Sequence, residues 1–421
     1  MDKFVIHGGN KLSGTVKIDG AKNASLALMP ASLLAAGKSI LYNTPELNDV
    51  FTMLKLLNHL GVKYQFENHK LELDTINITS QDAPYEHVKK MRASVYVLGP
   101  LLARYGAAKV SLPGGCAWGP RPINLHLEGL KKMGAEIDLV EGYIVAKAKK
   151  LKGADIHFDV SSVGATGNIL MAATLADGIT VIHNAAIEPE ITNLANYLKK
   201  MGAKIEGIGT SVLRIQGSEQ LSSTEIETIP DRIEAGTLLI AGAITGGNIK
   251  VYGITREYFN SLLIKLNDSG YNILENNDTI ELITSNNFII PTDVTTSVFP
   301  GYPTDMQAQW TAYMSLANGV STITDNIYID RFSHVPELIR LGANITVKEN
   351  SAVVKGVRKL KGAKVMSTDL RASASLVLAG LAAEGTTEVL RVYHLDRGYQ
   401  KIEEKLRALG ADIERVKGAE Y

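Results

Sequence analysis

The six residues Lys-Met-Gly-Ala-Glu-Ile at 132–137 have close counterparts at five other places in the chain. In each copy a glycine follows a charged, amphipathic stretch and precedes a strand-like run, so it is predicted to end a helix in the left-handed conformation. The spacing between these glycines is 68 to 73 residues, which is typical of a repeated structural unit. They are Gly61, Gly134, Gly202, Gly270, Gly342 and Gly410.

A second pattern with the same period lies half a unit earlier. There a helix rich in Ala, Leu, Ser and Gly ends in a glycine, and a β-branched strand follows. The helices expected at 24–36, 165–176 and 372–383 are apolar almost all round, which predicts helices packed on every side. Each unit is therefore interpreted as a buried helix, a strand, a loop, an exposed helix and two short strands. Six units predict an α/β fold with two bundles of three inner helices, each wrapped by sheet.

The boundary between the two bundles is predicted in the polar run 217–228, just before Pro230. Residues 4–18 precede the first inner helix, so we expect them to pair with strands of the last unit and bring the chain ends together. One domain would then hold repeats one to three in residues 22–229, and the second would hold repeats four to six in residues 1–21 and 230–421. Two linkers, near residues 21 and 229, would join lobes separated by a cleft that suits hinge closure and an active site.

Composition excludes several classes of function. The 421 residues include 44 Lys and Arg and 44 Asp and Glu, so the net charge is zero and no overall field favours nucleic acid or a membrane surface. The single cysteine excludes an internal disulfide and fits a reducing cytoplasm. Nine scattered histidines show no metal-ligand spacing, and we find neither a signal peptide nor a membrane span. We therefore expect a cytoplasmic protein without a metal.

The chain's only cysteine, Cys116, lies in the stretch 111–124, Ser-Leu-Pro-Gly-Gly-Cys-Ala-Trp-Gly-Pro-Arg-Pro-Ile-Asn. Three glycines and three prolines predict a loop, and the corresponding connection in the other five units lacks these clusters. A glycine-hinged loop with a thiol near Arg121 suits a lid over an anionic substrate, and positive surroundings would lower the thiol pKa from about 8.5. The alternative is a surface turn with an incidental cysteine.

The inner helices begin with polar or charged residues, although their bodies are apolar. Helix N-termini present unpaired N–H groups and favour anions, and Lys22, Arg92, Arg121 and Arg371 would add positive charge there. The alternative is that the Ser, Thr and Asp residues at these positions simply cap helices, which we expect for Asp231 and Thr304.

Eight motifs, in order along essentially the whole chain, resemble the enolpyruvyl transferase family. Its members that act on a UDP-linked sugar share the Pro-Gly-Gly-Cys loop, which those acting on shikimate 3-phosphate lack. The resemblance implies a two-lobed, inside-out α/β barrel with six βαβαββ-like repeats, three per domain. The motifs lie at 20–24, 91–94, 112–116, 119–122, 162–166, 299–309, 368–373 and 394–399.

The resemblance also implies a reaction, in which the enolpyruvyl group of phosphoenolpyruvate is transferred to the 3-hydroxyl of UDP-N-acetylglucosamine and phosphate is released. This is the first committed step of bacterial peptidoglycan synthesis and the target of the epoxide phosphonate fosfomycin. No cofactor, metal, nucleic acid, membrane or obligate protein partner is implied. A shikimate-type transferase and a catalytically silent scaffold of repeats remain the competing hypotheses.

Residue roles follow from the same resemblance. Cys116 would be the general acid that protonates C3 of phosphoenolpyruvate, and Asp305 would orient or deprotonate the sugar hydroxyl. The phosphate and carboxylate of phosphoenolpyruvate would be bound by Lys22, Arg121 and Arg397, while Asp369 and Arg371 would support the closed site. The UDP-sugar contacts would come from Asn23, Arg92, Arg121, Pro122, Ile123, Asn124, Leu125, Ser162, Val163, Gly164, Asp305 and Ile327.

Two positions depart from the family pattern. Asn124 stands where Asp is common, and Trp118 replaces a smaller aliphatic residue in the cysteine loop. We expect Trp118 to affect the resting conformation of that loop rather than the chemistry.

Overall fold

The computed structural model describes residues 2–89, 91–112, 123–285 and 288–417. The chain forms two compact units, one made of Met1–Asp19 with Pro230–Tyr421 and the other of Gly20–Ile229. Each unit has its own hydrophobic core. Cysteine loop residues 113–122, including Cys116, Trp118, Arg121 and Pro122, lie outside the described residues.

The sheets of the described residues are four-stranded and share one spatial arrangement, and repeats two, three and five build theirs from their own strands. In the second repeat, β6 (Asp82–Ala83) is parallel to β7 (Ala107–Ser111), which pairs antiparallel with β9 (Tyr143–Lys147), and β9 pairs antiparallel with β8 (Glu136–Val140). The other strands of the 20–229 unit are β3 (Lys38–Tyr42), β4 (Lys63–Glu67), β5 (Lys70–Asp74), β10 (Asp155–His157), β11 (Ile179–His183), β12 (Lys204–Glu206), β13 (Val212–Gln216) and β14 (Glu225–Glu227).

The unit that contains residues 230–421 uses the same order in its three sheets. Its strands are β1 (Asp2–His7), β2 (Ser13–Lys17), β15 (Asn248–Tyr252), β16 (Tyr271–Asn276), β17 (Thr279–Thr284), β18 (Val294–Thr295), β19 (Val320–Thr324), β20 (Asn344–Lys348), β21 (Ser351–Lys355), β22 (Lys364–Met366), β23 (Thr386–Leu390) and β24 (Asp412–Lys417).

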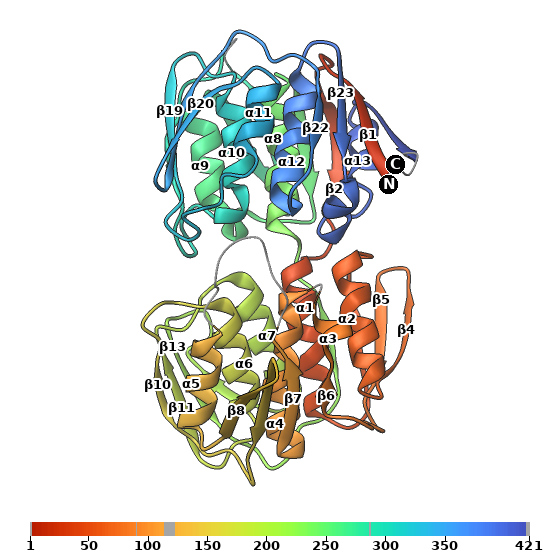
Figure 1. The fold of residues 1–421 in the computed structure, drawn as a ribbon, viewed down its shortest axis with the longest axis vertical. Coiled ribbons are helices and arrows are strands. Elements are labelled where there is room, and N and C mark those ends of the chain that lie inside the picture. The colour runs from red at the N-terminus through yellow and green to blue at the C-terminus, as the bar shows by residue number, and fades with distance from the viewer. Residues whose placement is uncertain (1, 90, 113–122, 286–287, 418–421) are drawn as a thin grey trace. The chain divides into compact units, whose positions relative to one another are not determined.

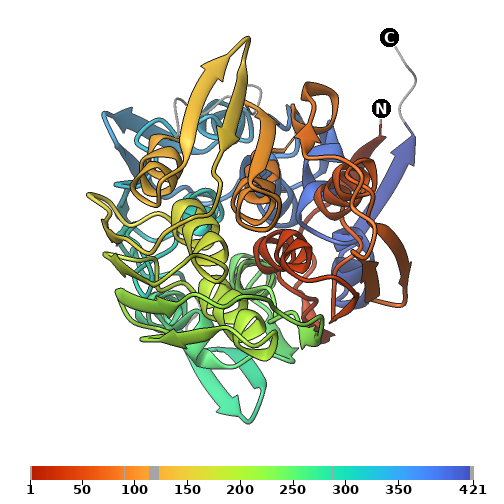
Figure 2. The same ribbon diagram turned by 90° about the horizontal axis from the view of Figure 1, so that it is seen from below.

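The inner helices are buried all round, as predicted, because small and apolar side chains cover every face. In α12 each residue from Leu370 to Leu381 is buried, and α12 packs against α8 and α10. Figure 1 shows these helices inside their unit with strands outside them, and Figure 2 views the helices of the 20–229 unit nearly end-on. The inner helices are α1 (Lys22–Ala31), α4 (Leu98–Tyr105), α6 (Val163–Ala173), α8 (Arg232–Ile244), α10 (Gln307–Met314) and α12 (Leu370–Ala382).

Short 3₁₀ turns extend some inner helices and lie in some connections. They are η1 (Ser32–Leu34), η2 (Arg92–Val97), η3 (Arg256–Tyr258), η4 (Thr304–Met306) and η5 (Val392–Arg397). The second and fifth repeats therefore enter their inner helices through η2 and η4 rather than directly.

The outer helices end at the repeated glycines, which confirms the prediction from the hexapeptide. All six glycines adopt a positive φ, between 88° and 108°. Residues with a Cβ disfavour this region, so glycine lets the chain reverse into the following strand. The outer helices are α2 (Asn48–His59), α5 (Asn124–Lys132), α7 (Pro189–Lys200), α9 (Asn260–Asp268), α11 (Val335–Arg340) and α13 (Ile402–Ala408), and a short α3 (Tyr85–Val88) lies in the second repeat.

The amino-terminal segment divides between two sheets. Strand β1 lies antiparallel between β23 and β24, which confirms the expected pairing with the last repeat. The same expectation is wrong for β2, which runs parallel to β15 of the fourth repeat. The reason is an exchange of leading strands: β14, which precedes α8, pairs with β3 of the first repeat, so the fourth sheet takes its leading strand from β2.

Backbone hydrogen bonds join the two linkers to each other. Asp231 N–H donates to the Asp19 carbonyl at 2.8 Å, and Ala21 N–H donates to the Ile229 carbonyl at 2.7 Å. The two linkers therefore run side by side where the chain passes between units.

Candidate active site

Asp305 is the centre of a charged cluster in the 230–421 unit. Arg371 donates to Asp305 Oδ2 from Nη2 at 2.8 Å and from Nε at 3.1 Å. Arg331 donates from Nη1 to Oδ1 at 2.8 Å. The Asp305 side chain is still 25% exposed, whereas those of Arg331 and Arg371 are 10% and 3% exposed. Two nearly buried cations therefore hold a carboxylate that a ligand can reach.

The electrostatics of the two arginines follow from this arrangement. Burial would lower the pKa of Arg371, but the interactions with Asp305, Tyr399 and Asp231 together outweigh burial and raise the pKa above its ordinary value. Asp305 and Asp369 together likewise outweigh burial and raise the pKa of Arg331. Arg371 Nη1 is buried without a hydrogen-bond partner among the described residues, and the guanidinium lies 5.4 Å from the centre of the Tyr399 ring. Both arginine side chains therefore stay positively charged in the folded protein.

Asp369 supports this cluster through the backbone. Its Oδ1 accepts from Arg371 N–H at 2.9 Å and from Ala372 N–H at 3.1 Å, so it caps α12. Its Oδ2 accepts from Ser333 and Thr368 at 3.3 Å each. Because the cap fixes the first turn of α12, it also fixes the direction in which Arg371 leaves the helix.

The two expected helix caps have different outcomes. Asp231 caps α8 by accepting from the N–H groups of Ile233 and Glu234, as predicted. The prediction is wrong for Thr304, whose hydroxyl caps no helix. Instead it donates to the buried carboxylate of Asp325 at 2.6 Å and accepts from Arg331 at 3.1 Å. Two charged groups orient this hydroxyl, because the carboxylate accepts its hydrogen and the guanidinium donates to its oxygen. Such charge-assisted hydrogen bonds are stronger than one from a backbone N–H, which explains the difference.

In the 20–229 unit, Lys22 is the first residue of α1 and lies 3.6 Å from Asp49 Oδ2, measured from Nζ. The lysine and aspartate side chains are 13% and 6% exposed. Asn23, the next residue, is exposed. The pair holds a nearly buried ammonium at the N-terminal end of an inner helix.

The start of α6 forms a second polar site in this unit. Ser162 caps the helix by accepting from Ala165 N–H at 3.3 Å. Gly164 lies against His126 of α5, and a Cβ at this glycine would be only 3.1 Å from His126 Nε2. Burial, helped by the positive charge of Arg92, lowers the pKa of His126 to about 4, so the ring is neutral near pH 7. The predicted UDP contacts Arg92, Leu125 and 162–164 thus belong to elements that pack together.

Asn168 fixes the tautomer of His126. Its side-chain oxygen accepts from Gly99 N–H, and its amide nitrogen donates to Val95 O and meets His126 Nδ1 at 3.1 Å. Since that nitrogen is the donor, Nδ1 is the acceptor and the ring proton lies on Nε2.

The remaining predicted site residues lie at the starts or ends of helices or in a loop. Ile123 and Asn124 begin α5, with Asn124 exposed and Leu125 buried, and Val163 is the first residue of α6. Arg397 ends η5, and the N–H of Ile327 donates to Asp325.

Sequence reasoning missed Arg331, Asp325, Asp49 and His126. Arg331 had a detectable signal, because it lies in the strand-to-outer-helix loop of the fifth repeat, four residues before α11. Arg121 occupies the same loop of the second repeat, three residues before α5. Comparing equivalent loops would have found Arg331.

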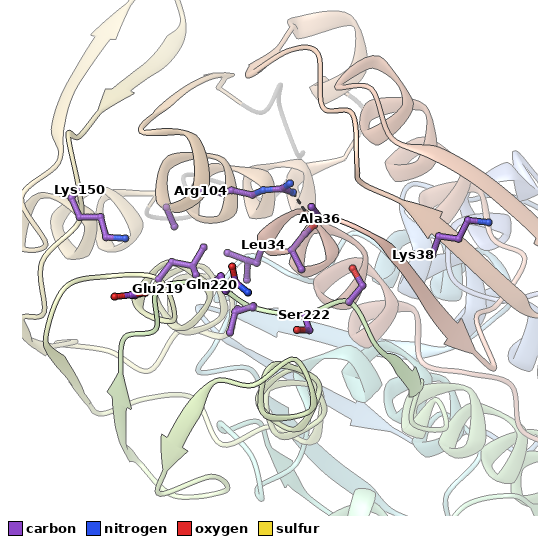
Figure 3. A pocket seen from close by; sticks show the side chains of 13 residues that line it. Leu34, Ala36, Lys38, Arg104, Lys150, Glu219, Gln220 and Ser222 are labelled. Atoms are coloured by element: carbon purple, nitrogen blue, oxygen red, sulfur yellow. Dashed lines mark hydrogen bonds between the residues drawn. The ribbon is translucent and has the colours of Figure 1, made fainter.

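A hollow of about 640 Å³ lies at the opposite, C-terminal ends of inner helices in the 20–229 unit and contains none of the predicted site residues. Its lining includes Leu34, Arg104 and Ser222 (Figure 3). Arg104 Nη1 donates to the carbonyls of Leu33 and Ala35 at 2.8 Å each. This cation is therefore used to satisfy the carbonyl groups at a helix end, a structural role.

The described residues contain neither a candidate metal-binding cluster nor a helix that could span a membrane. Within 2–89, 91–112, 123–285 and 288–417, no three or more His, Cys, Asp or Glu side chains group so that they could hold a metal ion. No helix in the same part of the chain has the length and apolar character to cross a membrane.

Comparisons with known proteins agree with this architecture. The family model of EPSP synthase (3-phosphoshikimate 1-carboxyvinyltransferase) matches residues 6–406. The UDP-N-acetylglucosamine 1-carboxyvinyltransferase of Chloroherpeton thalassium is 57% identical over 418 residues, which cover 99% of this chain and 97% of that relative. The protein of the same name from Geotalea uraniireducens is 54% identical over 416 residues, which are 99% of this chain and 100% of that relative.

Solved structures show the same fold. The enolpyruvyl transferase NikO from Streptomyces tendae superposes with a TM-score of 0.90 at 25% identity, covering 99% of both chains. EPSP synthase from Acinetobacter baumannii superposes with a TM-score of 0.76 at 18% identity, covering 99% of this chain and 100% of that one, and at that identity it supports the fold alone. The repeated α/β architecture and the full-length matches lead to one conclusion: this chain belongs to the EPSP synthase family of enolpyruvyl transferases.

Proposed function

We propose that this chain transfers the enolpyruvyl group of phosphoenolpyruvate to the 3-hydroxyl of UDP-N-acetylglucosamine and releases inorganic phosphate. The observation that carries the proposal is the identity of 54–57% along the whole chain with relatives named UDP-N-acetylglucosamine 1-carboxyvinyltransferase. The reaction would begin peptidoglycan synthesis, and its two water-soluble, anionic substrates and the single cysteine fit the cytoplasm.

The reaction is an addition followed by an elimination. The sugar oxygen bonds to C2 of phosphoenolpyruvate while C3 gains a proton, and the hydroxyl proton is lost. The tetrahedral intermediate then expels phosphate by breaking the C2–O bond, and C3 gives up a proton to restore the double bond. One substitution at C2 is the net result, and no oxidant or reductant is consumed.

Cations would bind phosphoenolpyruvate. The substrate carries a phosphate and a carboxylate, and charge-assisted hydrogen bonds from Lys22, Arg121 and Arg397 would match them. The nearly buried Asp49 supports this role for Lys22, because it holds the ammonium at the start of α1. Cys116 would donate the proton to C3 and could also hold the substrate covalently.

Asp305 would act on the sugar hydroxyl. Its two arginine partners hold the carboxylate in place by hydrogen bonds. The hydroxyl becomes strongly acidic as its oxygen bonds to the oxocarbenium-like C2, so a carboxylate beside it can take the proton at that stage. The same negative charge stabilises the positive charge that develops at C2. We therefore assign Asp305 first to orient the hydroxyl and then to take its proton.

The diphosphate of the nucleotide sugar would bind at the start of α6. Backbone N–H groups at a helix N-terminus favour phosphate, and Arg92 adds positive charge beside them. Gly164 keeps the backbone open there, since a side chain at this position would meet His126.

One experiment separates this proposal from the shikimate alternative, whose reaction gives the matching family its name. The purified chain is incubated with phosphoenolpyruvate and UDP-N-acetylglucosamine, and the product is identified by mass spectrometry and NMR. An enol ether on O3 of the glucosamine ring is expected. Absence of this product, with an enolpyruvyl product formed from shikimate 3-phosphate in a parallel reaction, would overturn the proposal.

A further inference from the structure

Asp325, which follows strand β19, is a buried carboxylate with neutral hydrogen-bond donors. Its relative exposure is 0%. Oδ1 accepts from the hydroxyl of Thr296 at 2.7 Å and from the N–H groups of Ile327 and Tyr328 at 2.9 Å each. Oδ2 accepts from the hydroxyl of Thr304 at 2.6 Å. Burying a carboxylate costs free energy, and these four hydrogen bonds offset the cost while fixing the side chain in one position.

The two oxygens of Asp325 have separate uses. Oδ1 accepts from the N–H groups of Ile327 and Tyr328, which closes the turn that follows Asp325, and also from the hydroxyl of Thr296. Oδ2 instead contacts Thr304, 21 residues away in sequence and directly before Asp305. A role confined to the local turn does not explain this second contact.

Thr304 is linked to the Asp305 carboxylate through Arg331. A hydroxyl has one hydrogen, and Thr304 uses it toward Asp325, so its lone pairs remain for Arg331 Nη1 at 3.1 Å. The same Nη1 donates to Asp305 Oδ1 at 2.8 Å. Hydrogen bonds therefore connect the N–H of Ile327 to the carboxylate of Asp305 through Asp325, Thr304 and Arg331.

We propose that Asp325 is a positioning residue that sets the segment 326–328 and the Asp305 carboxylate relative to each other. The inference rests on the proposed function, in which Ile327 contacts the UDP-sugar and Asp305 meets its 3-hydroxyl. Asp325 thereby joins recognition of the nucleotide sugar to alignment of its reacting hydroxyl. It touches neither substrate itself.

Two substitutions break the same link at different atoms. Asp325→Asn keeps an oxygen for the turn at Oδ1 but replaces Oδ2 by an amide group, which cannot accept from Thr304. Thr304→Val removes the hydroxyl and leaves Asp325 and its turn in place. Each is expected to lower kcat about tenfold with UDP-N-acetylglucosamine and phosphoenolpyruvate, the effect of losing one hydrogen bond. Because both break one link, the double variant should lose no more than about the larger single loss.

Two further variants serve as matched controls. Thr304→Ser keeps the hydroxyl and is expected to stay within about twofold of the wild-type kcat. Thr296→Val removes a donor from Oδ1, the oxygen of the turn, and also the acceptor for Asn326 N–H. It is expected to raise KM for UDP-N-acetylglucosamine with little change in kcat.

The outcomes separate this inference from the proposed function. An inactive wild-type chain would overturn both. With an active wild type, the inference is overturned if Asp325→Asn and Thr304→Val keep the wild-type kcat and only lower the thermal midpoint, or if their losses multiply in the double variant. A shared, non-additive loss of kcat that Thr304→Ser does not show supports it.

Discussion

Arg371 donates two hydrogen bonds to one oxygen of Asp305, although 66 residues separate them in sequence. Arg331 takes the other oxygen, so each side of the carboxylate meets a guanidinium. Only Asp305 of the three side chains is appreciably exposed. The arrangement fixes a negative charge at the surface of the unit with buried positive charge behind it.

Arg371→Lys is expected to lower kcat about 10- to 100-fold. Lysine keeps the charge but cannot donate from two adjacent nitrogens, and a hydrogen bond to a charged group contributes about 1.5–3 kcal/mol. Steady-state kinetics measure the effect. Arg340→Lys is the matched control. Arg340 is exposed on α11, where it forms a surface ion pair with Glu337 and hydrogen bonds to the Lys364 carbonyl, so the variant should retain the wild-type rate. Equal rates for both variants would remove Arg371 from the alignment of Asp305.

Cys116→Ser is expected to abolish turnover, while Cys116→Asp should retain part of it. A serine hydroxyl is a poor acid near pH 7, whereas a carboxylic acid can still carry a proton to C3. Fosfomycin should add its mass to the wild-type chain and to neither variant, as measured by intact-protein mass spectrometry. Full activity in the serine variant would assign the general acid to another group.

Gly134→Ala is expected to lower the free energy of unfolding by about 1–2 kcal/mol, the cost of a left-handed conformation for a residue with a Cβ. Gly134 has φ of +88° and no atom within 4 Å of the added Cβ. Gly61→Ala should cost more, because its Cβ would also lie 2.7 Å from the Asn77 carbonyl oxygen. Urea unfolding measures both. A neutral Gly134→Ala would contradict the role assigned to the repeated glycine.

His334 is expected to make the fold less stable in acid. Burial lowers its pKa from 6.5 to about 4, so between these values the unfolded chain binds a proton that the folded chain does not. Stability from this group is therefore present above pH 6.5 and is lost as the pH falls toward 4, by about 3 kcal/mol in all. His334→Phe should reduce the fall in urea midpoint between neutral pH and pH 4, and His157→Gln, at an exposed site, should not. If the urea midpoint of His334→Phe falls as much as that of the wild type between neutral pH and pH 4, the role assigned to His334 is contradicted.

The repeat, its glycines and its buried helices could be predicted because they depend on local pattern. Gly342 and its counterparts need a positive φ wherever an outer helix turns back, and the small apolar residues of α12 need burial on all sides. The exchange of β2 and β14 could not be predicted in this way. Either strand suits either sheet locally, and their partners are set by where the chain passes between the units.

Within the candidate site, sequence reasoning found residues that belong to recognisable motifs, such as Asp305 and Arg371. It missed Arg331 and Asp325, whose importance comes from contacts across 26 and 21 residues. It also misassigned Thr304, because a cap rule considers only the next turn of helix and not a buried carboxylate from another loop. Local sequence preferences do not predict hydrogen-bond partners that are distant in the sequence.

The proposed reaction is tested most directly by phosphate release with two acceptors in one vessel. The chain is given limiting phosphoenolpyruvate with equal amounts of UDP-N-acetylglucosamine and shikimate 3-phosphate, and phosphate and both acceptors are quantified. We predict that each phosphate released matches one UDP-N-acetylglucosamine consumed, while shikimate 3-phosphate stays constant. Phosphate release that follows the consumption of shikimate 3-phosphate, or no release at all, would contradict the proposal.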